Sequence, residues 1–390
     1  MKILIVHNNY GKYSGEEAVV DKMADMLTSH GHEVAFYRRT TEGVRESAVG
    51  KIKGFLSGIY SSSGVRGMWD ALRRERPDIV NVHNLYPFIS PAALFECKKS
   101  GVPVVMTIHN FRLICPTGLF MRDGLPCEVC LERGNEWSCV RYNCECNRLK
   151  SIGYTLRNVY ARWTGAYRKN VAAFACITDF QRQKLIAAGY EAERVTVIPN
   201  GIDAPTSYDL TGGNYVAYIG RLSYEKGYDL LIEVARRNPS IPFRFAGAKR
   251  EQSDMEIPGN VEFMGYLQKE ELSDFICHSR FVVPSRCYEG FPMAILEAAC
   301  YGKPTIGPAH GGFTEIIGRG EQAIGALFDP NSLDDLERKV VSLWNRPDEI
   351  ARLGEKAFEK LKREYSSEVI YQKWDNLFQK LIWNNYARTI

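Results

Sequence analysis

Apolar runs of strand length alternate with segments of helical periodicity along almost the whole chain, and this alternation restricts the possible folds more than any other feature. It is typical of parallel α/β units, in which a helix follows each strand. The alternation pauses in a polar, glycine-containing passage at 204–214 and then starts again. A chain of 390 residues is long enough for two cores. The sequence therefore predicts two Rossmann-like α/β domains, 1–205 and 206–366.

The expected elements follow from the same pattern. Strands are expected in the first half at 2–7, 32–37, 79–82, 102–108, 174–178 and 195–198, and in the second half at 215–219, 243–246, 261–264, 281–284, 304–306 and 325–328. Two helical stretches, 332–363 and 367–383, are expected to close the chain.

Targeting signals and charge suggest where the chain works. No window reaches the roughly 20 apolar residues of a membrane span, and Met1 leads directly into a strand-like run without signal-peptide features. We therefore expect a soluble cytoplasmic protein, without a nucleic-acid partner. The basic, partly aromatic stretches 51–76 and 141–169 also suit peripheral contact with an anionic membrane, such as the inner face of the plasma membrane. Alternatively, their apolar stripes pack on the sheet and their charges are solvated.

The loop after the first expected strand contains Gly11 and Gly15 and leads into a helix, which makes it a plausible phosphate site. It lacks the G-x-G-x-x-G spacing of dinucleotide-binding folds, and Arg38 and Arg39 follow the second strand instead of an acid. An oxidoreductase is thus disfavoured, although the two arginines suit the 2′-phosphate of NADP.

A second loop, 220–227, carries Arg221 and Lys226 between glycines, directly after a strand. Two cations on a loop where the backbone can approach a ligand suit a diphosphate, and an ordinary solvated turn fits the loop equally well.

Further along, Glu289 lies in a turn after a strand, and Pro292 is well suited to the start of the helix that carries Glu297. The two carboxylates can therefore face one ligand from different depths.

Together these motifs resemble glycosyltransferase family 4. The resemblance rests on the Glu289/Glu297 pair, the Gly-Arg…Lys-Gly loop, Pro-Asn-Gly-Ile-Asp at 199–203, and Gly311-Gly312…Glu315. It implies a retaining, hexosyltransferase-like enzyme with the GT-B fold, in which parallel sheets of two Rossmann-like domains face a central cleft. The first domain would bind the acceptor and receive the terminal helix 367–390, and the second would bind the nucleotide sugar.

The resemblance also implies roles for single residues. Arg221 and Lys226 would neutralise the diphosphate, Glu297 would bind the ribose, and Glu289, beside Gly290 and Phe291, would bind the donor sugar. Three other contacts with the donor are implied: His109 beside the sugar, the backbone of Gly15 at the phosphate, and the backbone of Tyr266 and Leu267 at the base. His109 also fits a core histidine at a strand end.

The family suggests the substrates. We prefer a UDP sugar over a GDP sugar as donor, and expect a saccharide acceptor, polyprenyl-linked, in the synthesis of a bacterial surface polysaccharide. No catalytic metal is expected. An NADP-dependent oxidoreductase and a non-catalytic GT-B binding protein remain as alternatives.

Six of the eleven cysteines lie in the segment 115–146, which we define as the cysteine-rich insertion. In a reducing compartment such a cluster favours metal over disulfides, and four thiolates suit tetrahedral zinc. The preferred structural zinc ligands are Cys115, Cys127, Cys130 and Cys144, with Cys139 or Cys146 as substitutes. An iron–sulfur cluster and free thiols are the alternatives.

Overall fold

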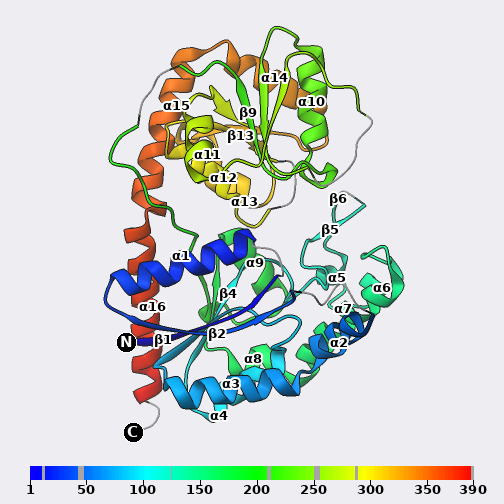
Figure 1. Cartoon of the computed structure of the whole chain (residues 1–390), viewed down its shortest axis with the longest axis vertical. Helices are drawn as coiled ribbons and strands as arrows, with labels where there is room; N and C mark the ends of the chain where they lie inside the picture. Colours follow the sequence, from blue (N-terminus) through cyan, green and yellow to red (C-terminus); the bar gives the residue numbers. More distant parts are fainter. Residues whose placement is uncertain are drawn as a thin grey trace. The chain divides into compact units, whose positions relative to one another are not determined.

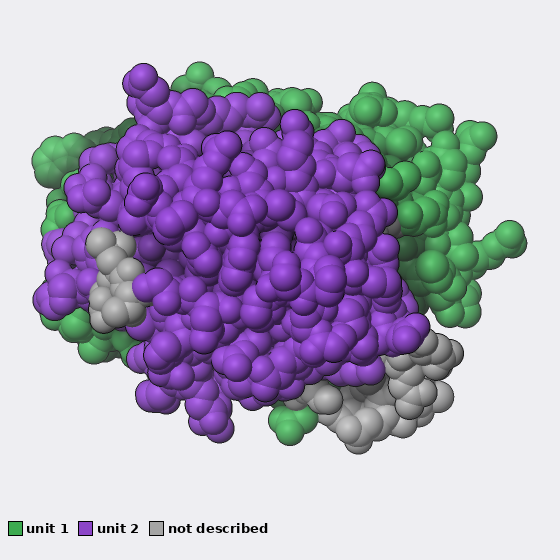
Figure 2. All heavy atoms as spheres, turned by 90° about the horizontal axis from the view of Figure 1, so that it is seen from above, with its two compact units in different colours: residues 1–199, 371–390 green, residues 200–370 purple. Residues whose placement is uncertain are grey.

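The computed structural model describes residues 1–10, 14–42, 48–123, 125–208, 212–249, 255–285 and 289–387. The chain divides into two compact units, coloured separately in Figure 2. Unit 1 consists of Met1–Pro199 and Tyr371–Ile390, and unit 2 of Asn200–Ile370.

Unit 1 contains a six-stranded parallel sheet in the order β2-β1-β3-β4-β7-β8 (Figure 1). Its strands are β1 (Lys2–Asn9), β2 (Glu33–Thr40), β3 (Ile79–Asn84), β4 (Val104–Ile108), β7 (Ala173–Cys176) and β8 (Val195–Val197). The central strands β1, β3 and β4 are almost completely buried, which explains their uninterrupted apolar runs.

Helices cover both faces of this sheet. They are α1 (Gly15–Ser29), α2 (Ala48–Ile59), α3 (Ser62–Glu75), α4 (Leu94–Lys99), α7 (Arg148–Thr164), α8 (Ala166–Asn170), α9 (Asp179–Ala187) and the last part of α16 (Ser367–Ala387). Figure 1 shows α1 on the face opposite α3, α4 and α8. Tyr371 of α16 stacks on His30 at a ring-centroid distance of 3.5 Å, so the terminal helix packs on unit 1.

The cysteine-rich insertion follows β4 and contains only short elements. They are β5 (Met121–Arg122), β6 (Leu125–Pro126), α5 (Val129–Glu132) and α6 (Ser138–Arg141).

Unit 2 also contains a six-stranded parallel sheet, in the order β11-β10-β9-β12-β13-β14. Its strands are β9 (Val216–Ile219), β10 (Phe243–Ala246), β11 (Val261–Gly265), β12 (Phe281–Val282), β13 (Thr305–Pro308) and β14 (Gly325–Phe328). Its helices are α10 (Tyr228–Arg237), α11 (Lys269–Cys277), α12 (Met293–Ala299), α13 (Gly311–Ile317), α14 (Leu333–Trp344) and α15 (Pro347–Lys360). This strand order is that of a dinucleotide-binding doubly wound fold.

The helical stretch expected at 332–363 contains two helices. The structure ends α14 at Trp344 and begins α15 at Pro347. Proline is favoured in the first turn of a helix because its missing N–H is not needed there. The periodicity continues across this break, and for that reason the sequence concealed it.

Both sheets reverse their strand order at one point, between β1 and β3 in unit 1 and between β9 and β12 in unit 2. The connections leave in opposite directions there, so the loops at the carboxyl ends of the two strands diverge and leave room for a ligand. Across the described residues, no helix is long and apolar enough to cross a membrane.

Close helix packing supports α12, the helix that carries Glu297. A Cβ atom on Gly354 of α15 would lie 1.9 Å from the carbonyl oxygen of Gly302, in the turn after α12. Only glycine permits this approach, since the atom it would meet belongs to the backbone.

We therefore predict that Gly354→Ala lowers the free energy of unfolding of unit 2. Alanine favours a helix interior by about 1 kcal/mol over glycine, but overpacking against an unyielding backbone costs about 1–3 kcal/mol. The net loss should be up to about 2 kcal/mol in urea unfolding. Gly259→Ala, where no described atom lies within 4 Å of the new Cβ, serves as the control. Equal stability of the two variants would contradict the account.

Candidate functional site

Hydrogen bonds to its backbone fix the loop after β9, which carries the two predicted cationic residues Arg221 and Lys226. The Tyr218 hydroxyl donates to the carbonyl of Arg221 at 3.0 Å, and the Lys226 amide donates to the carbonyl of Ser223 at 2.9 Å. Gly227 then adopts a left-handed conformation, φ 75°, and α10 begins. Arg221 is exposed and Lys226 half-buried. The loop thus presents both predicted cations at the carboxyl end of β9.

The loop after β12 brings Glu289 to Lys226, and the Lys226 ammonium forms an ion pair with the Glu289 carboxylate. The backbone of Glu289 is fixed independently, because its carbonyl accepts a hydrogen bond of 2.9 Å from the amide of Gly312 in α13. A Cβ on Gly312 would lie 2.3 Å from the carbonyl oxygen of Gly290, so α13 and this loop need glycine at their contact.

The other predicted donor-site residues of unit 2 have different environments. Glu297 is half-buried on α12, and Tyr266, just after β11, is 78% exposed. Leu267 packs on the buried cluster around Tyr215. The Phe291 side chain is buried and lies edge-on to Tyr365 at 5.9 Å, so only its backbone can face a ligand.

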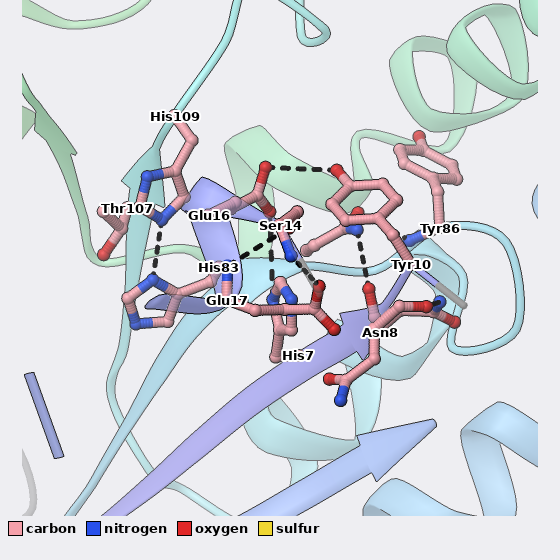
Figure 3. A network of polar contacts seen from close by, with 12 residues as sticks. His7, Asn8, Tyr10, Ser14, Glu16, Glu17, His83, Tyr86, Thr107 and His109 are labelled. Carbon is pink, nitrogen blue, oxygen red and sulfur yellow. Dashed lines mark hydrogen bonds and ion pairs between the residues drawn. The ribbon is translucent and has the colours of Figure 1, made fainter. Parts of the chain in front are cut away.

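In unit 1, His109 follows β4 and contacts His83 of β3 (Figure 3). The distance from His83 Nδ1 to His109 Nε2 is 2.8 Å, and the rings stack with centroids 5.1 Å apart. Burial lowers the pKa of His109 to about 4 and the pKa of His83 well below its usual value. Both rings are therefore neutral near pH 7, and one of them donates its single N–H to the other.

A polar network extends from this pair toward α1 (Figure 3). The Tyr10 hydroxyl donates to the Glu16 carboxylate at 3.1 Å, and burial raises the pKa of Glu16. His7 Nδ1 lies 3.8 Å from the other oxygen of Glu16. Among the described residues, neither nitrogen of His7 has a hydrogen-bond partner, although the ring is completely buried.

Gly15 opens α1 directly beside this network. Ser14 caps the helix, accepting from the Glu17 amide at 3.3 Å while its own amide donates to Glu17 Oε2 at 2.8 Å. A Cβ on Gly15 would meet no described atom within 4 Å, so packing within unit 1 does not require glycine there.

The sequence patterns did not indicate His7, His83, Glu16 or Arg112, the last of which shares a hydrogen bond with the Tyr10 hydroxyl. His7 and His83 each interrupt or end an apolar strand near its carboxyl end, and this was the available signal. Glu16 follows Gly15 in α1, and Arg112 lies shortly after His109 in the loop after β4. Only the folded sheet brings the carboxyl ends of β1 and β4 near each other.

The six cysteines of the insertion are free thiols. Cys130 is near enough to Cys115, Cys127 and Cys144 for these to affect its pKa, which burial chiefly raises, to about 12. The thiols of Cys139 and Cys144 are hydrogen-bonded to each other, which is the main reason that the pKa of Cys144 falls to about 7. Within the described ranges, however, no three His, Cys, Asp or Glu side chains are placed to hold a metal ion.

The predicted zinc site at Cys115, Cys127, Cys130 and Cys144 is therefore not supported. Other contacts hold the insertion. Phe120 is completely buried and stacks on Phe111 at 4.4 Å, and Glu136 is paired with Arg162 of α7 at 2.9 Å. These contacts connect the insertion to the rest of unit 1.

Two known families match the chain. Residues 13–205 match the family described as Glycosyltransferase Family 4, and residues 207–360 match the family described as Glycosyl transferases group 1.

Individual relatives agree with this. An uncharacterized 42.6 kDa protein of the cps region of Klebsiella pneumoniae is 26% identical over 387 residues, covering 88% of this chain and 96% of that protein. O-antigen chain mannosyltransferase C of Escherichia coli is 25% identical over 182 residues, 45% of this chain and 48% of that protein. The fold is similar to that of Anabaena Alr3699/HepE in complex with UDP and glucose, with a TM-score of 0.67, 17% identity, and coverage of 98% and 100% of the two chains.

The buried His7 provides a prediction for acid solution. Burial lowers its pKa from 6.5 to about 4, so between these values the unfolded chain binds a proton that the folded chain does not. The contribution of neutral His7 to stability is complete above pH 6.5 and is lost as the pH falls toward 4.

At pH 5 the loss should be about 2 kcal/mol for this one histidine. His7→Gln should therefore lose less stability than the native chain between pH 7.5 and pH 5, measured as the shift of the urea midpoint. Parallel curves for the two proteins would show that His7 does not contribute in this way.

Proposed function

The chain belongs to glycosyltransferase family 4, and on that premise we propose that it moves a sugar, with retention of configuration, from a nucleoside diphosphate sugar to a saccharide acceptor. The acceptor we propose is a lipid-linked intermediate of a bacterial surface polysaccharide. The O-antigen mannosyltransferase and the cps-region protein among its relatives support this substrate class.

The observation that carries the donor assignment is the ion pair between Lys226 and Glu289, where the strand order of unit 2 reverses. A diphosphate entering there would attract the Lys226 ammonium, and Arg221 lies on the same loop. Glu289 would lose its cation and become an acceptor for hydroxyl groups of the sugar. One binding event would thus neutralise the phosphates and prepare the carboxylate for the sugar.

The resemblance to the family supports the remaining donor contacts that we propose. Glu297 on α12 would accept from the ribose hydroxyls, and the backbone of Gly290 and Phe291 would approach the ligand. The backbone of Tyr266 and Leu267 would contact the base. UDP is our proposed nucleotide, and the similar fold that holds UDP and glucose supports it.

In unit 1, His109 would contact the donor sugar, and the open space at Gly15 would admit a phosphate oxygen to the first amides of α1. Because His109 is neutral, it can orient a hydroxyl of the sugar without adding a charge. Retention would then proceed by attack on the face of the departing diphosphate, whose oxygen would take the proton of the acceptor hydroxyl. The departing charge would be stabilised by fixed cations.

The family matches disfavour the NADP-dependent alternative. In the structure Arg38 is paired with Asp21 at 2.6 Å, and Arg39 donates to Ser63 at 2.7 Å.

We predict that Lys226→Ala and Glu297→Ala each weaken UDP-sugar binding about tenfold or more, because a charge-assisted hydrogen bond contributes roughly 1.5–3 kcal/mol. Isothermal titration calorimetry would measure the affinity. Lys339→Ala, on α14, is the matched control and should bind as the native chain does. Unchanged affinity in both site variants would exclude the proposed donor site.

We also propose that unit 1 contacts an anionic membrane surface through α2 and α7. These helices pack together, with the rings of Tyr60 and Tyr160 6.4 Å apart. Leu149 is 74% and Trp163 84% exposed, and Arg148 and Lys150 flank Leu149. Apolar side chains among basic ones suit the headgroup region. In the stretch 141–169 the apolar side chains at helical spacing are Leu156, Tyr160, Trp163 and Tyr167, and of these four only Trp163 is exposed.

This contact is tested by sedimentation with vesicles. The double variant Leu149→Ser/Trp163→Ala should bind phosphatidylglycerol-containing vesicles several-fold more weakly, since it loses apolar insertion. Trp383→Ala removes a tryptophan of similar exposure, 74%, from α16 and should bind like the native chain. Equal binding by the double variant and the native chain would disprove the contact.

A further inference from the structure

Two arginines of unit 1 share one tyrosine ring. The Arg112 guanidinium lies 5.8 Å and the Arg157 guanidinium 4.4 Å from the ring centroid of Tyr86. Arg112 follows His109 after β4, and Arg157, which is only 7% exposed, belongs to α7. The loop and the helix thus bring two cations together inside unit 1.

The hydrogen-bond partners recorded for these arginines are neutral. Arg112 Nη1 donates to Asn84 Oδ1 at 3.2 Å, and Arg112 also shares a hydrogen bond with the Tyr10 hydroxyl. Arg157 Nη2 donates to the carbonyl of Pro116 at 2.5 Å. Arg112 Nε is buried and has no partner among the described residues.

The two arginines differ in their surroundings: burial opposes the charge of Arg112, but Tyr10 and Glu16 outweigh it and raise its pKa, whereas burial lowers the pKa of Arg157. In the described part of the chain, neither arginine has a carboxylate oxygen within 4.0 Å. The carboxyl groups that act on them from farther away are Glu16 and Glu145, and burial raises the pKa of both. Buried charges in folded proteins are normally paired in direct contact, and among the described residues no carboxylate makes such a contact with Arg112 or Arg157.

Arg112 lines the same pocket as His109. Arg112, His83, Asn84, Tyr86 and His109 line a cavity of about 20 Å³ at the carboxyl ends of β3 and β4. A cavity of this size holds about one water molecule, so it admits one small group and not a sugar ring.

We propose that Arg112, with Arg157 behind it, binds an anionic oxygen group, a phosphate or a carboxylate, carried by the substrate that reaches His109. The guanidinium fork offers parallel N–H donors that match two oxygens of such a group. This assignment rests on the proposed function and adds a charge requirement to its substrate. The group belongs either to the acceptor, as a sugar acid or phosphate, or to the diphosphate of the donor.

The test compares Arg112→Gln and Arg112→Lys with the exposed control Arg133→Gln. Calorimetry would measure binding of glucuronate, inorganic phosphate, neutral glucose and UDP-glucose to each full-length protein. Near-ultraviolet circular dichroism would show that the variants are folded. If Arg112→Gln does not fold, Arg112→Lys, which keeps the charge and loses the fork, provides the comparison.

The native chain and Arg133→Gln should bind glucuronate or phosphate more tightly than glucose, and Arg112→Gln should lose about tenfold of that affinity. If UDP-glucose affinity stays constant, the anion belongs to the acceptor; if it falls equally, the anion is the donor diphosphate. Anion binding that does not depend on Arg112 would overturn the proposal. Lys226→Ala distinguishes a failure of the proposed donor site from a failure of the anion site at Arg112. Intact UDP-glucose binding in that variant would refute the donor site and leave the anion site unaffected.

Discussion

The reversal of strand order inside each parallel sheet is the constraint on which both candidate sites depend. A parallel sheet covered on both faces has no room for a ligand along its length, so polar chemistry is confined to its ends. In unit 1 the reversal lies between β1 and β3, whose carboxyl ends carry His7 and His83. In unit 2 it lies between β9 and β12, and the loops that follow carry Lys226 and Glu289.

The two candidate sites differ in charge, and the difference fits different roles in one reaction. The unit 2 site contains a cation and a carboxylate that satisfy each other until a charged ligand separates them. The histidines of unit 1 are kept neutral by burial, and the net charge of that site comes from Arg112 and Arg157. A reaction that releases a diphosphate needs fixed cations at the leaving group and uncharged donors at the sugar.

The sequence predicted the strands well, because fully buried parallel strands are apolar along their whole length, as in Ile3–Val6 of β1. The sequence was less informative where contacts with neighbouring elements determine the local structure. The helical stretch at 332–363 is divided into two helices, the second of which begins at Pro347. The cysteine spacing predicted zinc because sequence alone could not show that buried Phe120 holds the insertion. The pairing of His83 with His109 depends on strand order, which periodicity does not encode.

A crystal structure with a bound UDP-sugar tests the central claim most directly. The account predicts electron density for the diphosphate between the loop at 220–227 and the loop that carries Glu289, with Lys226 moved from Glu289 to a phosphate oxygen. Diphosphate density at another place in unit 2, with the Lys226–Glu289 ion pair intact, would contradict it.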